Sequence, residues 1–555
     1  MEKVWLKNYP QGVPATIDPD KYKSLGDMFL NSVHKFRDRP AYSNLGTVLD
    51  YAEVENLSRR FAAYLSNNAG LKKGDRIAIM MPNLLQYPVV LFAALRAGLI
   101  VVNTNPLYTE RELEHQLNDA GAVAIVILEN FAETLAAILE KTKIQTIITT
   151  RIGDMAPFPK SLLINFVVKY IKKMVPPFDL PTAVKFNDAL KSADSKAFKD
   201  VSVSHDDIAF LQYTGGTTGI AKGAVLTHRN MIANLLQVRA WVSNELREEA
   251  HEIFITALPL YHIFSLTANA FALTLGAKSV LITNPRDMKG FVKELGKEKF
   301  TFMAGVNTLF NGLLNTPGFS ELDFSHVKLF LGGGMAVQES VAKAWQEVTG
   351  HTIIEAYGLT ETSPGVCVNP ANNQDFSGNI GLPLPSTEVC VKDINGKQRI
   401  FNEPGELCVR GPQVMQGYWN RPEETANVMD ERGWLHTGDI AIIDAGGFVK
   451  LVDRLKDLII VSGFNVYPNE VENVVASHPK VLEVGAIGVP HDKSGEAVKL
   501  FVVKKDQSLT EEELKDYCYE QMSRYKCPKY IEFVDDLPKS NVGKVLRKEL
   551  RNLSS

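Results

Sequence analysis

The chain has 555 residues, 45% of them hydrophobic and 22% charged, with a formal net charge of −4 at pH 7. This composition is ordinary for a soluble globular protein, and at roughly 150 residues per domain the length predicts three or four structural units. The charge balance excludes a global attraction to nucleic acid, so we expect no nucleic-acid partner.

No feature near the start of the chain predicts export or a membrane span. Residues 1–10 lack a basic region followed by an apolar core, so we expect no signal peptide. The apolar run 87–102 is interrupted by proline, arginine and glycine, which favours buried α/β packing over a spanning helix. The five cysteines are scattered without a CxxC pair: Cys367, Cys390, Cys408, Cys518 and Cys527. This spacing argues against a disulfide framework or a zinc site and predicts a cytoplasmic protein.

Buried strands followed by helical patterns recur in the first part of the chain. Short apolar runs at 76–81, 123–128 and 145–150 predict strands. Thr109 and Glu112 fit a capping box that opens a helix. This alternation predicts an α/β fold with mostly parallel sheets.

The stretch 160–178 combines lysines with a helical apolar pattern. One face of the predicted helix carries six apolar residues: Leu163, Phe166, Val167, Tyr170, Ile171 and Met174. Lys169, Lys172 and Lys173 lie off that face. A basic amphipathic helix of this kind can rest in a membrane interface, whereas the alternative is a helix whose apolar face packs on the core.

The segment 213–223 is the most informative part of the chain. It reads Tyr-Thr-Gly-Gly-Thr-Thr-Gly-Ile-Ala-Lys-Gly and follows a short apolar run at 208–211. Successive backbone N–H groups in a glycine-rich turn form an anion nest, to which threonine hydroxyls and a lysine add donors. The segment therefore predicts a phosphate-binding loop after a strand, although it lacks the common P-loop spacing. A flexible surface loop is the alternative.

The pattern changes from about residue 381. Short apolar runs alternate with turn signals at 395–396, 403–406 and 444–447, which predicts antiparallel strands in a small barrel-like subdomain.

The last hundred residues predict a small α+β domain. Strands are expected at 484–489 and 498–503, and helices at 470–477 and 510–522. The candidate boundary is 453–457.

Six motifs stand in the order found in the adenylate-forming enzymes, the acyl-CoA synthetases, luciferases and adenylation domains. They are the loop above and the segments 356–361, 433–439, 453–457, 462–468 and 538–544. The chain resembles this family over its whole length and looks most like the bacterial long-chain fatty-acid–CoA ligases. The resemblance implies a large N-terminal domain over 1–453, a hinge at 454–457 and a mobile C-terminal domain over 458–555.

The resemblance also implies the nucleotide site. Twelve positions would bind ATP, and a thirteenth, Gly463, would border CoA. The twelve are Thr214, Gly215, Gly216, Thr217, Thr218, Gly219, Lys222, Gly333, Gly334, Tyr357, Asp439 and Arg454. Tyr357 would pack on adenine and Asp439 would bind the ribose. Glu361 would bind Mg²⁺, with Thr214 also touching the metal, and Thr360 would donate to the α-phosphate. An ordinary polar turn is the alternative reading of each short motif.

By the same resemblance, two lysines and one glycine would serve different stages of a reaction that has two steps. Lys544 would stabilise the adenylation transition state, and Lys456 would be the hinge about which the small domain turns. Gly463 would then leave room for the pantetheine arm of CoA. On composition alone, Lys544 is one cation in a basic tail.

The sequence says less about which acid is the substrate. His262, in the segment 258–264, would line the acyl pocket by resemblance, and a buried core histidine is the alternative. Some long-chain relatives carry a tryptophan gate four residues further on, where this chain has Leu266.

The resulting hypothesis is a ligase that converts a long-chain fatty acid, Mg·ATP and CoA into acyl-CoA, AMP and pyrophosphate. A different acid, transfer of the acyl group to a carrier protein, and a non-catalytic lipid-binding protein are the alternatives. A peripheral location on the inner face of the cell membrane and a homodimer are left open.

Overall fold

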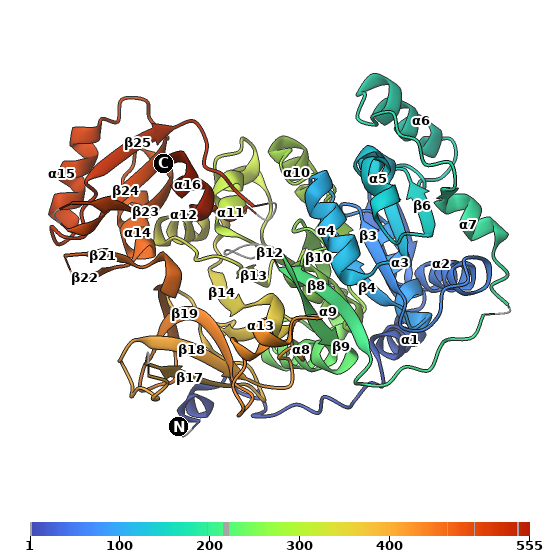
Figure 1. Ribbon diagram of the computed structural model, residues 1–555, viewed down its shortest axis with the longest axis horizontal. Coiled ribbons are helices and arrows are strands. Elements are labelled where there is room, and N and C mark those ends of the chain that lie inside the picture. The colour runs from blue at the N-terminus through green and yellow to red at the C-terminus, as the bar shows by residue number, and fades with distance from the viewer. Residues whose placement is uncertain are drawn as a thin grey trace.

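The protein is a mixed α/β molecule with a large N-terminal domain and a smaller C-terminal domain (Figure 1). The computed structural model describes residues 3–196, 198–214, 221–393, 395–462, 464–492, 494–540 and 543–554. Six of the predicted site residues lie outside these ranges, namely Gly215, Gly216, Thr217, Thr218, Gly219 and Gly463.

The first large sheet has seven strands in the order β7-β6-β5-β3-β4-β8-β9. Its pairings are parallel except for the last, β8 with β9. The strands are β3 Arg76–Met80, β4 Ile100–Asn103, β5 Ala124–Leu128, β6 Thr146–Thr150, β7 Val184–Lys185, β8 Ile208–Thr214 and β9 Lys222–Thr227. The strands predicted from the apolar runs are therefore confirmed, because each run is buried within this sheet.

The second large sheet has nine strands in the order β16-β15-β14-β13-β12-β10-β11-β1-β2. Its central pairings are parallel, and antiparallel pairs close both edges. The strands are β1 Pro40–Asn44, β2 Thr47–Asp50, β10 Ile253–Thr256, β11 Lys278–Leu281, β12 Phe302–Gly305, β13 Leu329–Gly332, β14 Ile353–Gly358, β15 Gly365–Val368 and β16 Leu382–Pro383.

Helices separate and cover the two sheets. The α-helices of this part are α1 Leu25–Phe36, α2 Tyr51–Ala63, α3 Gln86–Arg96, α4 Glu110–Ala120, α5 Ala132–Ile138, α6 Lys160–Phe166, α7 Phe186–Ser192, α8 His228–Trp241, α9 Ile263–Thr274, α10 Met288–Leu295, α11 Asn307–Leu314, α12 Glu339–Thr349 and α13 Pro422–Ala426. Short turns are η1 Val4–Asn8, η2 Tyr64–Asn68, η3 Glu129–Phe131, η4 Leu139–Lys141, η5 Val167–Ile171, η6 Glu248–Ala250, η7 Phe319–Glu321 and η8 Thr360–Thr362.

One continuous apolar core joins the two large sheets, and a second core lies under α4 and α5. The predicted capping box at the start of α4 is confirmed, since the Glu112 N–H donates to Thr109 Oγ1 and Glu112 Oε2 accepts from the Thr109 N–H. The run at 87–102 forms α3 and β4 and is buried, as predicted for α/β packing.

The predicted barrel-like subdomain is an open sheet. Its strands are β17 Glu388–Lys392, β18 Gly405–Arg410, β19 Leu435–Ile443 and β20 Val449–Arg454, paired antiparallel in chain order. Among the described residues β17 does not pair with β20, so no closed barrel is present. Four strands are too few for closure, since even small barrels use about eight.

The C-terminal part forms a separate lobe, drawn in orange to red at the upper left of Figure 1. Its elements are η9 Leu455–Asp457, β21 Ile459–Val461, β22 Phe464–Val466, α14 Pro468–Ala476, β23 Val481–His491, β24 Gly495–Lys504, α15 Glu511–Gln521, β25 Tyr530–Val534 and α16 Arg547–Ser554. Two apolar clusters of its own fill this α+β lobe, as predicted.

Candidate active site

The predicted nucleotide residues lie at strand ends. Thr214 ends β8 and pairs directly with Lys222 at the start of β9, so the two residues form the base of the predicted phosphate loop. Gly333 and Gly334 follow β13, which is parallel to its neighbour β14. Gly334 has φ +77°, a conformation that favours glycine. Ligands in open α/β sheets bind beyond the carboxyl ends of such strands.

Tyr357, Asp439 and Arg454 form one hydrogen-bonded cluster. The Tyr357 hydroxyl donates to Asp439 Oδ2 at 2.6 Å, and Arg454 Nε lies 3.2 Å from Asp439 Oδ1. Asp439 on β19 pairs with Arg454 on β20, whereas Tyr357 comes from β14 of the large sheet. Burial, reinforced by the Asp439 charge, raises the pKa of Tyr357 well above its usual value, so the phenol stays a donor. The cluster joins the nine-stranded sheet to the small sheet.

Glu361 and Lys222 both contact Tyr418. The Tyr418 hydroxyl donates to Glu361 Oε1 at 2.7 Å, and Lys222 Nζ lies 5.1 Å from the centre of the Tyr418 ring. Lys222 also forms an ion pair with Glu424. Thr360 adjoins Glu361 in η8. Carboxylate and hydroxyl oxygens are ligands that Mg²⁺ prefers, so the chemistry of Glu361 and Thr214 fits this cation.

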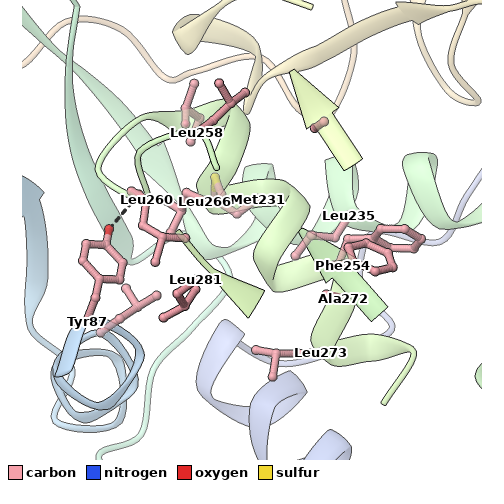
Figure 2. Close-up of a cluster of buried hydrophobic side chains, with 14 of the residues drawn as sticks. Tyr87, Met231, Leu235, Phe254, Leu258, Leu260, Leu266, Ala272, Leu273 and Leu281 are labelled. Carbon is pink, nitrogen blue, oxygen red and sulfur yellow. Dashed lines mark hydrogen bonds between the residues drawn. The ribbon is translucent and has the colours of Figure 1, made fainter. Parts of the chain in front are cut away.

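The segment before His262 is held rigidly. The Asn83 side chain donates to the carbonyls of Thr256 and Leu258, both at 3.0 Å, and accepts from the Leu260 N–H at 2.8 Å. Figure 2 shows Tyr87 of α3 reaching the same segment, where its hydroxyl donates to the Leu260 carbonyl at 2.8 Å. These contacts fix His262, which caps the N-terminus of α9.

Lys544 enters this site from the C-terminal lobe. Desolvation lowers its pKa to about 8; the nearby Arg454 charge acts in the same direction and that of Asp439 against it. Burial lowers the pKa of His262 to about 4, with a further contribution from the Lys544 charge, so His262 is neutral near pH 7. The structure therefore brings together Lys544, His262, Asp439 and Arg454 from separate parts of the sequence.

Contacts from α11 reach the C-terminal lobe at the residue before Lys544 and on β23. The Thr308 hydroxyl donates to the Gly543 carbonyl at 3.0 Å, and Asn311 Nδ2 donates to the Leu482 carbonyl at 3.2 Å. Gly543 has φ +82°, and a Cβ atom there would lie 2.4 Å from Thr308 Oγ1. Only glycine fits this approach between the lobes.

Arg547 ties the last helix to the predicted hinge. Its guanidinium lies 3.3 Å from both Asp453 Oδ1 and Asp457 Oδ2, and 2.8 Å from Glu472 Oε2. The predicted hinge residue Lys456 lies in η9 between these aspartates. Desolvation lowers the pKa of Lys456, and the Arg454 charge adds to this.

Three residues of this site were not predicted from the sequence: Tyr418, Thr308 and Arg547. Tyr418 lies in a Gly-Tyr-Trp turn, whose aromatic pair beside a glycine was a usable signal. The turn is placed by β9, because the Trp419 N–H donates to the Gly223 carbonyl and the Val225 N–H donates to the Gly417 carbonyl. Thr308 sits in an ordinary helix and offered no signal.

Comparison with known proteins agrees with this geometry. Residues 29–419 match the family model of the AMP-binding enzyme, and residues 470–544 match that of the AMP-binding enzyme C-terminal domain. The chain therefore belongs to the AMP-binding enzyme family.

Two similar curated proteins from distant bacteria carry the same name. A long-chain-fatty-acid–CoA ligase of Escherichia coli O157:H7 is 58% identical over 100% of this chain and 98% of its own length. A protein of the same name from Bacillus subtilis is 38% identical over 99% of this chain and 98% of its own length.

Solved structures share the fold over nearly the whole chain. ATP-bound MatB from Rhodopseudomonas palustris superposes with a TM-score of 0.82 at 29% identity, covering 95% of this chain and 98% of that one. The anthranilate CoA ligase AuaEII in complex with anthranoyl-AMP gives 0.86 at 24% identity, covering 97% and 99%, which is a likeness of fold.

Proposed function

We propose that the protein is a long-chain fatty-acid–CoA ligase. ATP and a fatty acid form acyl-AMP and pyrophosphate, and the CoA thiol then displaces AMP. The observation that carries the proposal is the convergence of Lys544, from the C-terminal lobe, on His262, Asp439 and Arg454 of the N-terminal part. The full-length relatives with this printed name support the choice of substrate.

Each residue has a defined task in this proposal. The Asp439 carboxylate accepts hydrogen bonds from the ribose, and Lys544 stabilises negative charge that develops at the α-phosphate. Thr214, Lys222 and the loop between them hold the triphosphate, Gly333, Gly334 and Tyr357 line the adenine, and Thr360 donates to the α-phosphate. Glu361 and Thr214 would hold Mg²⁺, which neutralises phosphate charge when bound. The neutral His262 would border the carboxyl end of the acid.

The second half-reaction requires a movement of the C-terminal domain. We take 1–453 as the N-terminal domain, 454–457 as the hinge and 458–555 as the mobile domain, with Lys456 as the residue that absorbs the rotation. The η9 turn separates the small sheet from β21 and carries no regular strand pairing, which supports this assignment. Gly463 would border the pantetheine arm after the rotation.

The substrate assignment has a direct test. Saturated acids from about C6 to C18 should yield acyl-CoA with efficiency rising along the series, because each buried CH₂ contributes about 0.8 kcal/mol. The assay measures AMP and acyl-CoA with CoA present and omitted. AMP release without dependence on CoA would indicate transfer to another acceptor, and a preference for aryl acids would refute the long-chain assignment.

The helix at 160–171 carries the membrane part of the proposal. Most of its large apolar residues are exposed, including Phe166 at 52% and Ile171 at 65%, and the aromatic Phe158 before it is 81% exposed. The core-packed alternative is therefore wrong for this segment. Figure 1 shows α6 at the upper right edge, projecting from the sheets. We propose that this surface, residues 158–174, rests peripherally in the inner face of the cell membrane, with its lysines near anionic headgroups. Within the described chain, none of the helices is both long and apolar enough to span a bilayer.

Vesicle binding tests this surface. Phe166→Ser together with Ile171→Ser should reduce cosedimentation with phosphatidylglycerol-containing vesicles by about tenfold or more, because two buried apolar side chains contribute a few kcal/mol. Ile400→Ser with Leu553→Ser is the matched control, since both residues are exposed elsewhere. The assignment would be contradicted if the wild-type protein did not cosediment with these vesicles, or if both double variants lost vesicle binding equally.

A further inference from the structure

Three potential metal-binding side chains form a row across the small sheet. Cys390 on β17 pairs directly with Cys408 on β18, and Cys408 pairs with His436 on β19. Directly paired residues of neighbouring strands share one face of a sheet. Glu406 lies two residues before Cys408 and therefore on the same face.

The distances among the ligand atoms of Glu406, Cys408 and His436 match a metal site. Cys408 Sγ lies 3.6 Å from His436 Nδ1, which lies 2.8 Å from Glu406 Oε2. The ligand atoms of Glu406, Cys408 and His436 all lie within 4.8 Å of one another. With Zn–S of about 2.3 Å and Zn–N of about 2.0–2.1 Å, the sulfur and nitrogen ligands of a tetrahedral zinc lie about 3.6 Å apart. The sulfur–nitrogen pair is thus already spaced as zinc requires.

A second layer of contacts orients these groups. Glu406 Oε1 accepts from the Gly438 N–H at 3.1 Å, and Asp430 Oδ2 lies 3.8 Å from His436 Nε2. Asp430 in turn pairs with Lys392 at 2.8 Å. Metal-bound histidines usually have a carboxylate near the nitrogen that does not bind the metal, and Asp430 stands on that side of His436, beyond hydrogen-bonding distance.

We propose that Cys408, His436 and Glu406 form a zinc site. The thiolate and imidazole favour zinc over the hard Mg²⁺ of the nucleotide site, which takes oxygen ligands. Cys408 is buried, while His436 and Glu406 keep 26% and 24% of their side chains exposed, so an ion can enter from solvent. In the metal-free protein the same contacts are a histidine–carboxylate hydrogen bond beside a thiol.

The position of the site gives it a role. His436 precedes Asp439 by three residues on β19, and Glu406 binds the backbone of Gly438 between them. A bound ion would cross-link β18 to the strand that presents the proposed ribose ligand. The linear sequence hides this arrangement, because its ligands come from paired strands rather than from a CxxC spacing.

Metal titration of the full chain tests the proposal. Chelator-treated protein should take up one equivalent of Zn²⁺ per chain against a competing indicator. Co²⁺ should bind with the near-ultraviolet charge-transfer absorption of a cobalt–thiolate bond, and Zn²⁺ should displace it. Both signals should disappear in Cys408→Ala and in the more exposed variant His436→Gln. Cys518→Ala, a buried thiol in the C-terminal lobe, should retain them.

Circular dichroism without metal first establishes whether each variant is folded. If Cys408→Ala is unfolded, the metal titration of His436→Gln alone tests the zinc site. The zinc site is refuted if wild type gives no cobalt–thiolate absorption. It is equally refuted if the absorption survives in a folded Cys408→Ala or His436→Gln protein, since the ion then binds elsewhere.

Discussion

Replacing Lys544 by alanine should slow formation of acyl-AMP by about 10²–10³-fold, the usual effect of removing one preorganised charge from a transition state. Supplied acyl-AMP and CoA should still react at the wild-type rate, because that step follows rotation of the lobe. Lys544 is near enough for its charge to lower the pKa of His262 and for the charges of Arg454 and Asp439 to act on its own pKa, as the first half-reaction requires. The test measures the rate of acyl-AMP formation and the rate of thioester formation from supplied acyl-AMP separately in the wild type and in Lys544→Ala.

Lys548→Ala is the matched control, since this exposed lysine lies in α16, four residues after Lys544. The wild-type kcat/KM for acyl-AMP formation should fall as pH rises through about 8. The charged form of Lys544 is present below its lowered pKa and is lost above it. Lys544→Arg should remove this decline, because arginine stays protonated. Equal loss of both half-reactions in Lys544→Ala, in a protein of unchanged Tm, would contradict the separate roles.

Replacing Glu361 by glutamine should raise the Mg²⁺ concentration needed for half-maximal acyl-AMP formation by at least about tenfold. Changes to the outer shell of a metal site alone have effects of that size. The amide keeps the shape of the side chain and can still accept from Tyr418, so the fold should be retained. The measurement is the rate of acyl-AMP formation across a Mg²⁺ titration, with Glu361→Ala as the more severe variant.

Glu423→Gln, an exposed carboxylate on α13, controls for the loss of one negative charge. Tyr418→Phe tests the hydrogen bond from Tyr418 to Glu361 apart from the carboxylate itself, because it removes the hydroxyl donor and leaves the Glu361 carboxylate in place. A smaller shift in the Mg²⁺ requirement is expected there. An unchanged Mg²⁺ requirement in Glu361→Gln and Glu361→Ala would remove Glu361 from the metal site.

Most of the fold was predictable because buried parallel strands leave a strong local signal. The runs at 76–81, 123–128 and 145–150 are rich in β-branched or aliphatic residues, and each forms an interior strand of the first large sheet. The small sheet was predicted as antiparallel but wrongly as barrel-like, since turn signals give the number and spacing of strands and not their closure. Closure depends on long-range pairing, which no local pattern encodes.

The site was predictable in part for the same reason. Tyr357, Asp439 and Arg454 stand in motifs, and the structure joins them in one cluster. Tyr418, Thr308 and Arg547 act through partners far away in the sequence, so their neighbours along the chain say little about them. The helix at 160–171 shows a further limit, because its periodicity identified an apolar face without indicating whether protein covers it.

The contacts between the lobes are polar. Thr308 meets a backbone carbonyl, Asn311 meets another, and Arg547 reaches the carboxylate of Asp453. The two neutral hydrogen bonds each stabilise this arrangement by only about 0.5–1.5 kcal/mol, because water can replace each partner, and the contact between the charged Arg547 and Asp453 contributes about 1.5–3 kcal/mol. Among the residues that the structure describes, the apolar clusters of the C-terminal lobe share no member with the main core, so polar contacts fasten the lobe. Its orientation is an equilibrium that bound substrates can shift, since a difference in affinity of a few kcal/mol between two orientations reverses their populations.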